Sequence, residues 1–226
     1  MWVLGIDTAT RTASVGLVRD GEIVVEQSRP AAASHGEEFF EMMEGVLRDA
    51  GIEFRQVDAL AISNGPGSFT GLRIGLSAAK GLAYAGGQKV AAVSTLEALA
   101  LSAQAVEGPV CACLDARKRE VYVAVFEGAG ERVRRLTEDA VLRPEDVSLL
   151  APPGCLLVGD GAALYRDLIG ERLRVEVRFG DQTHPRGGVV ARMGWEKLRQ
   201  GRCENLGTLS PVYVRGPVLS APRTHA

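Results

Sequence analysis

The chain has 226 residues, of which 46% are hydrophobic and 24% charged, a composition typical of globular proteins and not of disordered ones. Its 26 Lys and Arg residues against 28 Asp and Glu residues give a formal net charge of −2. Proteins that bind nucleic acid alone usually carry a basic excess, so this balance argues against solitary nucleic-acid binding but allows a role within a complex. No run of 18 uncharged apolar residues occurs, which predicts that no segment spans a membrane.

The first half of the chain predicts three strands and then alternating helices and strands. We expect strands over 2–7, 13–18, 22–27, 57–63 and 89–93, and helices over 37–50, 70–86 and 96–105. Ser34 and Glu37 form a capping box for the first helix, and Gly51 ends it. Its apolar residues fall on one helical face, which predicts that this face is covered.

A similar pattern begins again near residue 108. The apolar segment Val110–Asp115 ends in an aspartate, as Trp2–Asp7 does. Beyond it we expect strands over 120–126, 132–137, 155–158 and 175–179, glycine-rich turns at 127–131 and 159–161, and helices from 162 and over 189–199. The repetition predicts a duplicated α/β fold, with an N-terminal domain over 1–107 and a smaller C-terminal domain over 108–226. We expect its tail to be flexible after about residue 218.

Cysteine and histidine usage predicts neither a metal site nor a hydrolytic triad. The four cysteines, Cys111, Cys113, Cys155 and Cys203, lack the CxxC spacing of zinc sites, and Cys111 and Cys113 lie in an apolar strand. Buried, reduced cysteines are typical of cytoplasmic proteins, and we expect that compartment. The three histidines are isolated in the sequence: His35, His184 and His225.

Two aspartates and two glycine-rich loops are candidates for contact with a nucleotide. A carboxylate that ends a strand can hold a hydrated metal or orient a phosphate, but it can also cap its own turn. The loop Asn64–Gly71 joins a strand to a helix, where backbone amides can bind an anion or simply form a tight turn. The run Arg117–Arg119 is expected to be a solvated turn. The candidates are Asp7, Thr8, Gly65, Gly67, Ser68, Asp115, Gly159 and Gly161.

The helix over 70–86 carries small residues at helical spacing. Glycine within a helix costs about 0.5–1 kcal/mol relative to alanine, so Gly71 and Gly75 require a packing reason. Close approach of another element is the simplest reason. The residues alone leave open whether that neighbour belongs to the same chain or to a partner. The same holds for Phe39, Met42 and Met43, since methionine suits adaptable interfaces as well as cores.

Several of these segments together resemble the TsaB (YeaZ) family. The resemblance covers nearly the whole chain and is carried by residues 5–9, 64–75, 78–83, 93–100, 115–122, 159–161 and 211–215. It implies the actin-like ATPase/sugar-kinase (RNase H-like) fold, with central mixed sheets flanked by helices. It also implies a role in attaching threonylcarbamoyl to the adenosine next to the anticodon in tRNAs that read codons starting with A. In that family the chain is a non-catalytic partner of the catalytic paralogue TsaD and works with the ATPase TsaE.

The resemblance also implies where chemistry is absent and where the partner binds. TsaD has a metal-binding His-Leu-Glu-Gly-His segment, and Thr95 and Leu99 stand at the two histidine positions here, so neither a metal site nor catalysis is expected. We expect a homodimer when TsaD is absent, tRNA contact only through the complex, and at most weak contact with ATP or ADP. The expected interface residues are Phe39, Met42, Met43, Val46, Gly71, Leu72, Gly75, Ala78, Ala79 and Leu82. The alternative is a stand-alone ATPase or phosphotransferase that uses Asp7, Asp115 and the glycine loops.

Overall fold

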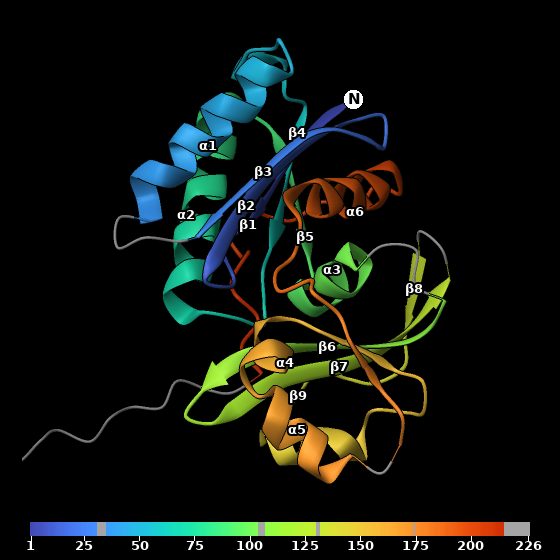
Figure 1. The fold of residues 1–226 in the computed structure, drawn as a ribbon. Coiled ribbons are helices and arrows are strands. Elements are labelled where there is room, and N and C mark those ends of the chain that lie inside the picture. Colours follow the sequence, from blue (N-terminus) through green and yellow to red (C-terminus); the bar gives the residue numbers. More distant parts are fainter. Residues whose placement is uncertain (31–34, 104–106, 130–131, 174, 215–226) are drawn as a thin grey trace, which may run out of the picture.

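The computed structural model describes residues 1–30, 35–103, 107–129, 132–173 and 175–214, with two mixed β-sheets flanked by helices (Figure 1). The predicted helix cap Ser34 and the tail after residue 218 lie outside the described residues. None of the described helices combines the length and apolar character needed to cross a membrane.

The first sheet has five strands in the order β3-β2-β1-β4-β5. Its first three strands are antiparallel neighbours, and β4 and β5 run parallel to β1. The strands are β1 (Trp2–Asp7), β2 (Thr12–Arg19), β3 (Glu22–Pro30), β4 (Ala59–Ser63) and β5 (Lys89–Val93). Helices α1 (His35–Asp49) and α2 (Phe69–Gly86) cover one face, and α6 (Gly187–Arg199) covers the other (Figure 1). A short 3-10 helix, η1 (Phe54–Gln56), precedes β4.

The second sheet repeats this topology, which confirms the predicted duplication. Its order is β11-β10-β6-β7-β8, again with an antiparallel set of three strands and two strands parallel to its first strand. The strands are β6 (Gly108–Arg117), β7 (Glu120–Ala129), β8 (Arg132–Arg135), β10 (Leu156–Val158) and β11 (Arg178–Phe179), with β9 (Ala140–Leu142) beside β7. The helices of this half are η2 (Pro144–Leu149), α4 (Asp160–Leu164) and α5 (Arg166–Arg172). Helix α3 (Thr95–Ser102) packs between β6 and α6.

Several predicted segments differ from the structure in their bounds or type. The strand expected to end at residue 126 continues to Ala129, because its ladder with β6 extends to the pair Gly108 and Gly128. The loop expected at 159–161 becomes helical at Asp160. The strand expected over 175–179 is limited to Arg178–Phe179. Elements η1, η2 and β9 were not predicted, because three to six residues are too few to show a hydrophobic period.

Helix α6 returns to the first sheet, so dividing the chain at residues 107 and 108 does not describe its packing. The helix contacts all five strands of that sheet. Glycines permit this backbone-to-backbone approach: a Cβ atom on Gly5 would lie 2.2 Å from the carbonyl oxygen of Gly187. A Cβ atom on Gly16 would lie 2.1 Å from the backbone nitrogen of Gly188. These distances are shorter than a Cβ contact allows. The close packing of α6 on the sheet therefore requires glycine at these positions.

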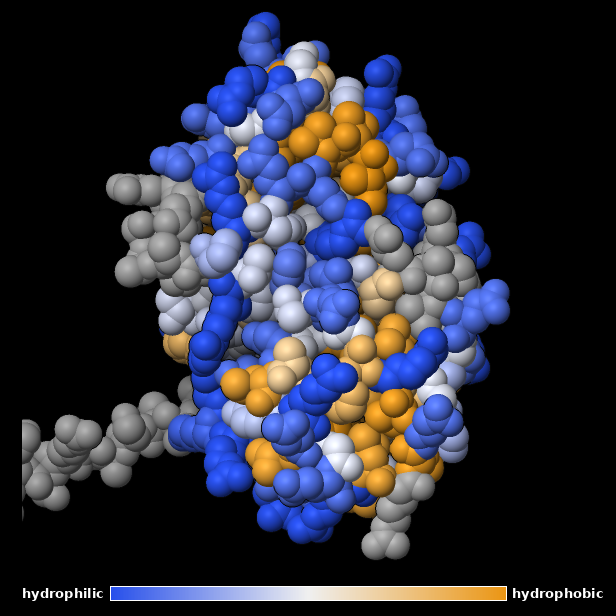
Figure 2. All heavy atoms as spheres, viewed as in Figure 1, coloured by the Kyte–Doolittle hydropathy of each residue, from blue (hydrophilic) through white to orange (hydrophobic). Residues whose placement is uncertain are grey.

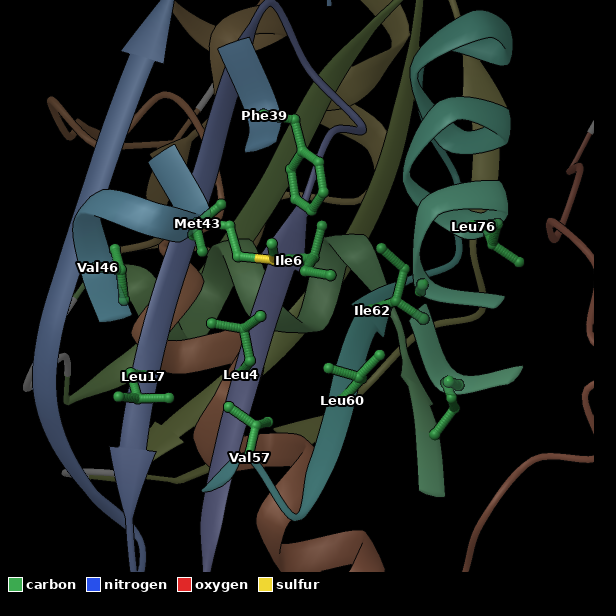
Figure 3. Packing of buried hydrophobic residues seen from close by; sticks show 14 of the residues in the cluster. Leu4, Ile6, Leu17, Phe39, Met43, Val46, Val57, Leu60, Ile62 and Leu76 are labelled. Atoms are coloured by element: carbon green, nitrogen blue, oxygen red, sulfur yellow. The ribbon is translucent and has the colours of Figure 1, made fainter. Parts of the chain in front are cut away.

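The largest hydrophobic core lies between the first sheet and helices α1 and α2. Side chains of β1, β2 and β4 point from the sheet toward these helices (Figure 3). Phe39, Met43 and Val46 of α1 and Leu76 of α2 close the core from the other side (Figure 3). Burial of large aliphatic and aromatic side chains stabilises such a layer by about 1.5–3 kcal/mol per side chain. The helical period therefore correctly marks the covered face of α1.

Candidate functional site

A cleft of about 540 Å³ lies at the junction of the two halves. The first half contributes the turn after β1 and the loop before α2, and the second half contributes the end of β6. The cleft is lined by Ala9, Thr10, Arg11, Gly67, Ser68, Phe69, Thr70, Asp115, Ala116, Arg117, Lys118, Tyr122, Asp160 and Tyr213. The fold thus brings together the two predicted strand-ending aspartate regions and the predicted glycine loop.

Asp7 lies behind the cleft and does not line it. Its side chain is fully buried, and the backbone nitrogen of Ala9 donates a hydrogen bond to its Oδ1 at 3.3 Å. Among the described residues its Oδ2 has no hydrogen-bond partner. Burial raises the pKa of Asp7 to about 7, and the negative charge of Asp160 acts in the same direction. Near neutral pH this carboxyl group is therefore divided between its protonated and ionised forms.

Asp115 occupies the matching place in the second half but has a different environment. Its Oδ2 lies 3.3 Å from Arg117 and 3.7 Å from Arg11, which comes from the first half. Its Oδ1 accepts hydrogen bonds from the backbone nitrogen of Arg117 at 2.9 Å and from the Tyr165 hydroxyl at 3.4 Å. Its own backbone nitrogen donates to Asp160. Two guanidinium groups thus face this carboxylate, and one of them links the halves across the cleft.

Several backbone amides of the loop Asn64–Gly71 donate hydrogen bonds within the chain. The backbone nitrogen of Gly65 donates to Thr95 Oγ1 at 3.1 Å, and that of Ser68 donates to the carbonyl oxygen of Ala9 at 2.7 Å. The amide of Gly71 donates to Ser68 Oγ at 3.2 Å as part of the α2 cap. Amides already paired in this way cannot also bind an anion. Of the two alternatives that the sequence leaves open for this loop, these bonds favour the tight turn, with Gly67 and Ser68 on the cleft wall.

The other candidate glycines have packing reasons. A Cβ atom on Gly65 would lie 2.3 Å from the carbonyl oxygen of Val212, and Gly65 has a φ of +130°. A Cβ atom on Gly159 would lie 2.1 Å from the carbonyl oxygen of Cys113. Gly161 belongs to α4 and packs on the backbone of β6. Thr8 also serves the fold, because its hydroxyl donates to the carbonyl oxygen of Gly71 at 2.8 Å.

Most of the predicted interface residues lie in the core of this chain, which is a correction. The buried ones are Phe39, Met42, Met43, Val46, Gly71, Leu72, Gly75 and Ala79. A Cβ atom on Gly75 would lie 2.3 Å from Thr8 Oγ1, so the small residues admit the chain's own β1–β2 turn. Only Ala78 and Leu82 of the predicted set are partly exposed. The prediction failed because an apolar helical face first covers the sheet of its own chain.

The outward side of α1 and α2 forms a different apolar surface, which we term the α1–α2 groove. It is lined by Phe39, Phe40, Phe69, Thr70, Arg73, Ile74, Ser77 and Ala78 and has a volume of about 540 Å³. Phe40 and Phe69 are 42% and 46% exposed. The predicted interface residues include neither Phe40 nor Phe69. Exposure of Phe40 could have been inferred, because this residue falls outside the apolar period of α1. Farther along α2, Gly81 has open space around its Cβ position and Tyr84 is 89% exposed.

The last described residues join this groove to the cleft. Tyr213 stacks on Phe69 with ring centroids 5.5 Å apart, and the Arg73 guanidinium lies 3.7 Å from the Phe69 ring centre. Arg73 Nε also donates to the Tyr213 hydroxyl at 3.2 Å. Phe69 therefore has one neighbour in the cleft wall and another in the groove.

Comparisons with known proteins identify the family. The family model of TsaD, tRNA N6-adenosine threonylcarbamoyltransferase, matches residues 23–169. The TsaB protein of Escherichia coli, described as a tRNA threonylcarbamoyladenosine biosynthesis protein, is 32% identical over 96% of this chain and 96% of its own length. TsaB of Bacillus subtilis is 26% identical over 95% of this chain and 94% of its own. The chain belongs to the TsaB family. Its role accordingly lies in the biosynthesis of threonylcarbamoyladenosine in tRNA.

Solved structures agree with this assignment and with the predicted fold class. YeaZ from Pseudomonas aeruginosa superimposes with a TM-score of 0.81 at 29% identity, covering 94% of this chain and 99% of that one. The ROK hexokinase from Thermus thermophilus has a TM-score of 0.51 at 14% identity, covering 88% of this chain and 100% of the hexokinase. The hexokinase likeness shows the shared actin-like ATPase/sugar-kinase fold alone.

Within the TsaB-like fold, Thr95 and Leu99 stand in packed positions. Both side chains are fully buried. Thr95 Oγ1 accepts from Gly65, and Leu99 joins the apolar cluster that α3 forms with β6. Among the described residues, no group of three His, Cys, Asp or Glu side chains is placed to hold a metal ion. The buried cysteines, Cys111, Cys113 and Cys155, are free thiols in the core, and Cys203 is an exposed free thiol.

Proposed function

We propose that this protein is a non-catalytic subunit that binds and activates TsaD, in a complex that also includes the ATPase TsaE. The complex would attach threonylcarbamoyl to the adenosine beside the anticodon in tRNAs that read codons starting with A. The single observation that carries the proposal is the exposed α1–α2 groove in a chain of the TsaB family. Its compartment would be the cytoplasm, where tRNA is modified.

The residue types that line the groove support a partner contact at this surface. Interface hot spots are enriched in aromatic residues and arginine, and here Phe40, Phe69 and Arg73 line one surface. The open position at Gly81 would allow a partner helix to approach the backbone of α2 closely. TsaD has the same fold family, so its equivalent helices would give a pseudo-symmetric bundle. Without TsaD, a second copy of this chain would pack on the same surface.

The cleft supports a non-catalytic role in a different way. Arg11 and Arg117 pair with Asp115, and Asp7 is buried behind the wall with a pKa raised to about 7. Neither carboxylate is therefore well suited to hold a hydrated cation for phosphate chemistry. We propose that any contact with ATP or ADP here is weak.

A second candidate function is a stand-alone ATPase or phosphotransferase. The cleft between two actin-like halves, lined by Asp115, Asp160 and Lys118, is the observation that favours it. Metal-dependent ATP turnover by the isolated chain, lost on Asp115→Asn, would establish it. Absence of turnover together with full activity of the reconstituted complex would decide for the non-catalytic subunit.

Two experiments test the proposal. The first is tRNA modification reconstituted from TsaD, TsaE and the remaining components, with and without this chain; modification that proceeds equally without it would refute the proposal. The second is co-purification with TsaD of Phe40→Asp beside the matched control Leu149→Asp. Leu149 is 80% exposed on the other half of the molecule, so both variants put a charge on an exposed apolar position. We expect only Phe40→Asp to lose TsaD.

A further inference from the structure

A second groove lies on the opposite side of the first sheet from α1 and α2. It has a volume of about 540 Å³ and is bounded by α3, β8 and α6. Its lining residues are Glu97, Leu101, Arg132, Val133, Arg192, Met193, Trp195, Glu196, Lys197, Arg199, Gln200 and Arg202. We term it the α3–α6 groove. In Figure 1 its three elements lie together to the right of the upper sheet, whereas α1 and α2 lie to the left.

This groove is basic, although the chain as a whole is slightly acidic. Five of its lining residues are Arg or Lys and two are Glu, in a chain whose formal net charge is −2. Lys197 serves the fold, because its Nζ donates to the carbonyl oxygen of Ala92 and burial lowers its pKa. Arg132, Arg199 and Arg202 are exposed. The face drawn in Figure 2 is hydrophilic over much of its surface, with separate hydrophobic patches in the upper and lower parts.

The exposed arginines keep their charge available. Arg199 lies over the Trp195 ring, 4.8 Å from its centre, and Arg202 donates to the side-chain oxygen of Gln200. Both contacts are with uncharged groups, so neither neutralises the guanidinium. Arg132 comes from the edge strand β8, and Arg134 is also exposed on that strand. Positive charge thus reaches the groove both from strand β8 and from the C-terminal end of α6 with the residues after it.

We propose that the α3–α6 groove binds the sugar–phosphate backbone of the tRNA while the α1–α2 groove holds the partner. The proposal rests on the proposed function, which supplies the RNA, and it adds a direct contact from this chain within the complex. Arginine binds phosphate through several parallel N–H donors, and fixed positive groups release counterions from a polynucleotide. Because the two grooves lie on opposite faces of one sheet, both could be occupied at once. An acidic protein surface is the competing occupant.

The charge balance predicts how strong this contact would be. Three exposed arginines neutralise at most about three phosphates, each of which contributes roughly 0.7–0.9 to the slope of log affinity against log salt. Such a contact alone gives weak tRNA binding on a chain with a net charge of −2. It adds more to the overall affinity when other subunits hold the same tRNA. This accounts for a basic groove on a protein whose composition argues against solitary RNA binding.

The test compares two triple variants that remove equal charge. Arg132→Gln, Arg199→Gln and Arg202→Gln remove the exposed cations of the groove. Arg55→Gln, Arg143→Gln and Arg172→Gln remove three exposed cations elsewhere and serve as the control. Each variant is assembled with TsaD and TsaE, and its affinity for unmodified tRNA is measured at two salt concentrations. We expect the groove variant to bind about tenfold more weakly than the control, with a salt slope smaller by roughly two to three.

The remaining outcomes separate this proposal from the proposed function. Equal tRNA affinity and slope for the two variants would overturn the RNA contact, even if the complex requires the chain for modification. Loss of TsaD or TsaE from the groove variant, with tRNA affinity intact, would assign the groove to a protein instead. If wild-type chain and TsaD do not associate, the proposed function fails. The same two variants of the full chain alone, measured against tRNA at low salt, then decide the groove separately.

Discussion

The inward and outward faces of α2 carry similar small residues but meet different neighbours. On the inward face, Gly71 and Gly75 lie against Thr8, where an added Cβ atom would come within 1.9 and 2.3 Å of its oxygens. On the outward face, Gly81 has no atom within 4 Å of that position. Small residues therefore indicate that something approaches closely, but the surrounding topology decides whether that neighbour belongs to the chain.

The largest expected effect is at Gly75. A leucine at this position would overlap Thr8 and Ile62, which lie 2.3 and 3.1 Å from the Cβ position inside a packed layer. Overpacking of a core typically costs 1–3 kcal/mol, and a backbone-close site exceeds that range. We therefore expect Gly75→Leu to unfold the protein or to lower its midpoint in urea substantially. A cooperative transition unchanged from wild type would show that the inward face is not packed as described.

A smaller effect on stability, which depends on pH, is expected at Asp7. This residue precedes Thr8, on which α2 packs. Its pKa is raised from 3.8 to about 7 in the folded state, so the folded protein holds a proton that the unfolded chain releases. The stability from this proton is complete below pH 3.8 and is lost as pH rises through about 7. The loss is on the order of 4 kcal/mol at most.

The measurement for Asp7 is urea unfolding of wild type and Asp7→Asn at pH 5 and pH 8. Since asparagine does not titrate, the variant lacks this pH-dependent loss. The free energy of unfolding of Asp7→Asn minus that of wild type should therefore be larger at pH 8 than at pH 5. A constant difference would contradict the raised pKa.

At Gly81 we expect loss of partner binding without loss of folding. Leucine has room there and a better helix propensity than glycine by about 0.8 kcal/mol, so Gly81→Leu should be at least as stable as wild type. It would block close approach of a partner helix and weaken TsaD binding by tenfold or more in a pull-down or titration. Gly81→Ala is the matched control and should retain binding. Full binding by the leucine variant would place the interface elsewhere.

The smallest expected effect is at Thr8, whose hydroxyl donates to the carbonyl oxygen of Gly71 inside the core. Thr8→Val keeps the shape of the side chain and removes this hydrogen bond. Removal of a buried hydrogen bond costs about 1–3 kcal/mol when the remaining group is left without a partner. Thermal unfolding should show a modest decrease in midpoint, and TsaD binding should be unaffected because Thr8 is buried inside this chain.

Much of the fold was predictable because it depends on local patterns. Alternating apolar residues marked the strands, and the repeated strand that ends in Asp7 or Asp115 revealed the duplication. The direction in which α2 presents its glycines was not predictable, because it depends on the turn after β1 that packs beneath the helix. The α3–α6 groove was also hidden, since Glu97, Arg132 and Arg199 meet only in the folded chain.

The candidate site shows the same limit. The cleft brings together Asp115 and Gly67, which were separate candidates in the sequence. The sequence does not show that Arg11 reaches Asp115 from the other half, or that the Gly65 amide is bonded to Thr95. Such pairings are set by tertiary geometry, and they favour the tight turn over the anion site, the two alternatives that the sequence left open for this loop.

The return of α6 to the first sheet has a consequence for synthesis on the ribosome. The sheet is complete in sequence at Val93, but α6, the helix that packs on all five strands of its second face, consists of residues 187–199. At about 5–20 residues per second, the intervening hundred residues take roughly 5–20 s to be made. During that time Val3, Val18 and Ala61 have no helix over them, so the nascent first half exposes an apolar surface on which chaperones can act. Truncation before Gly187 would make that exposure permanent.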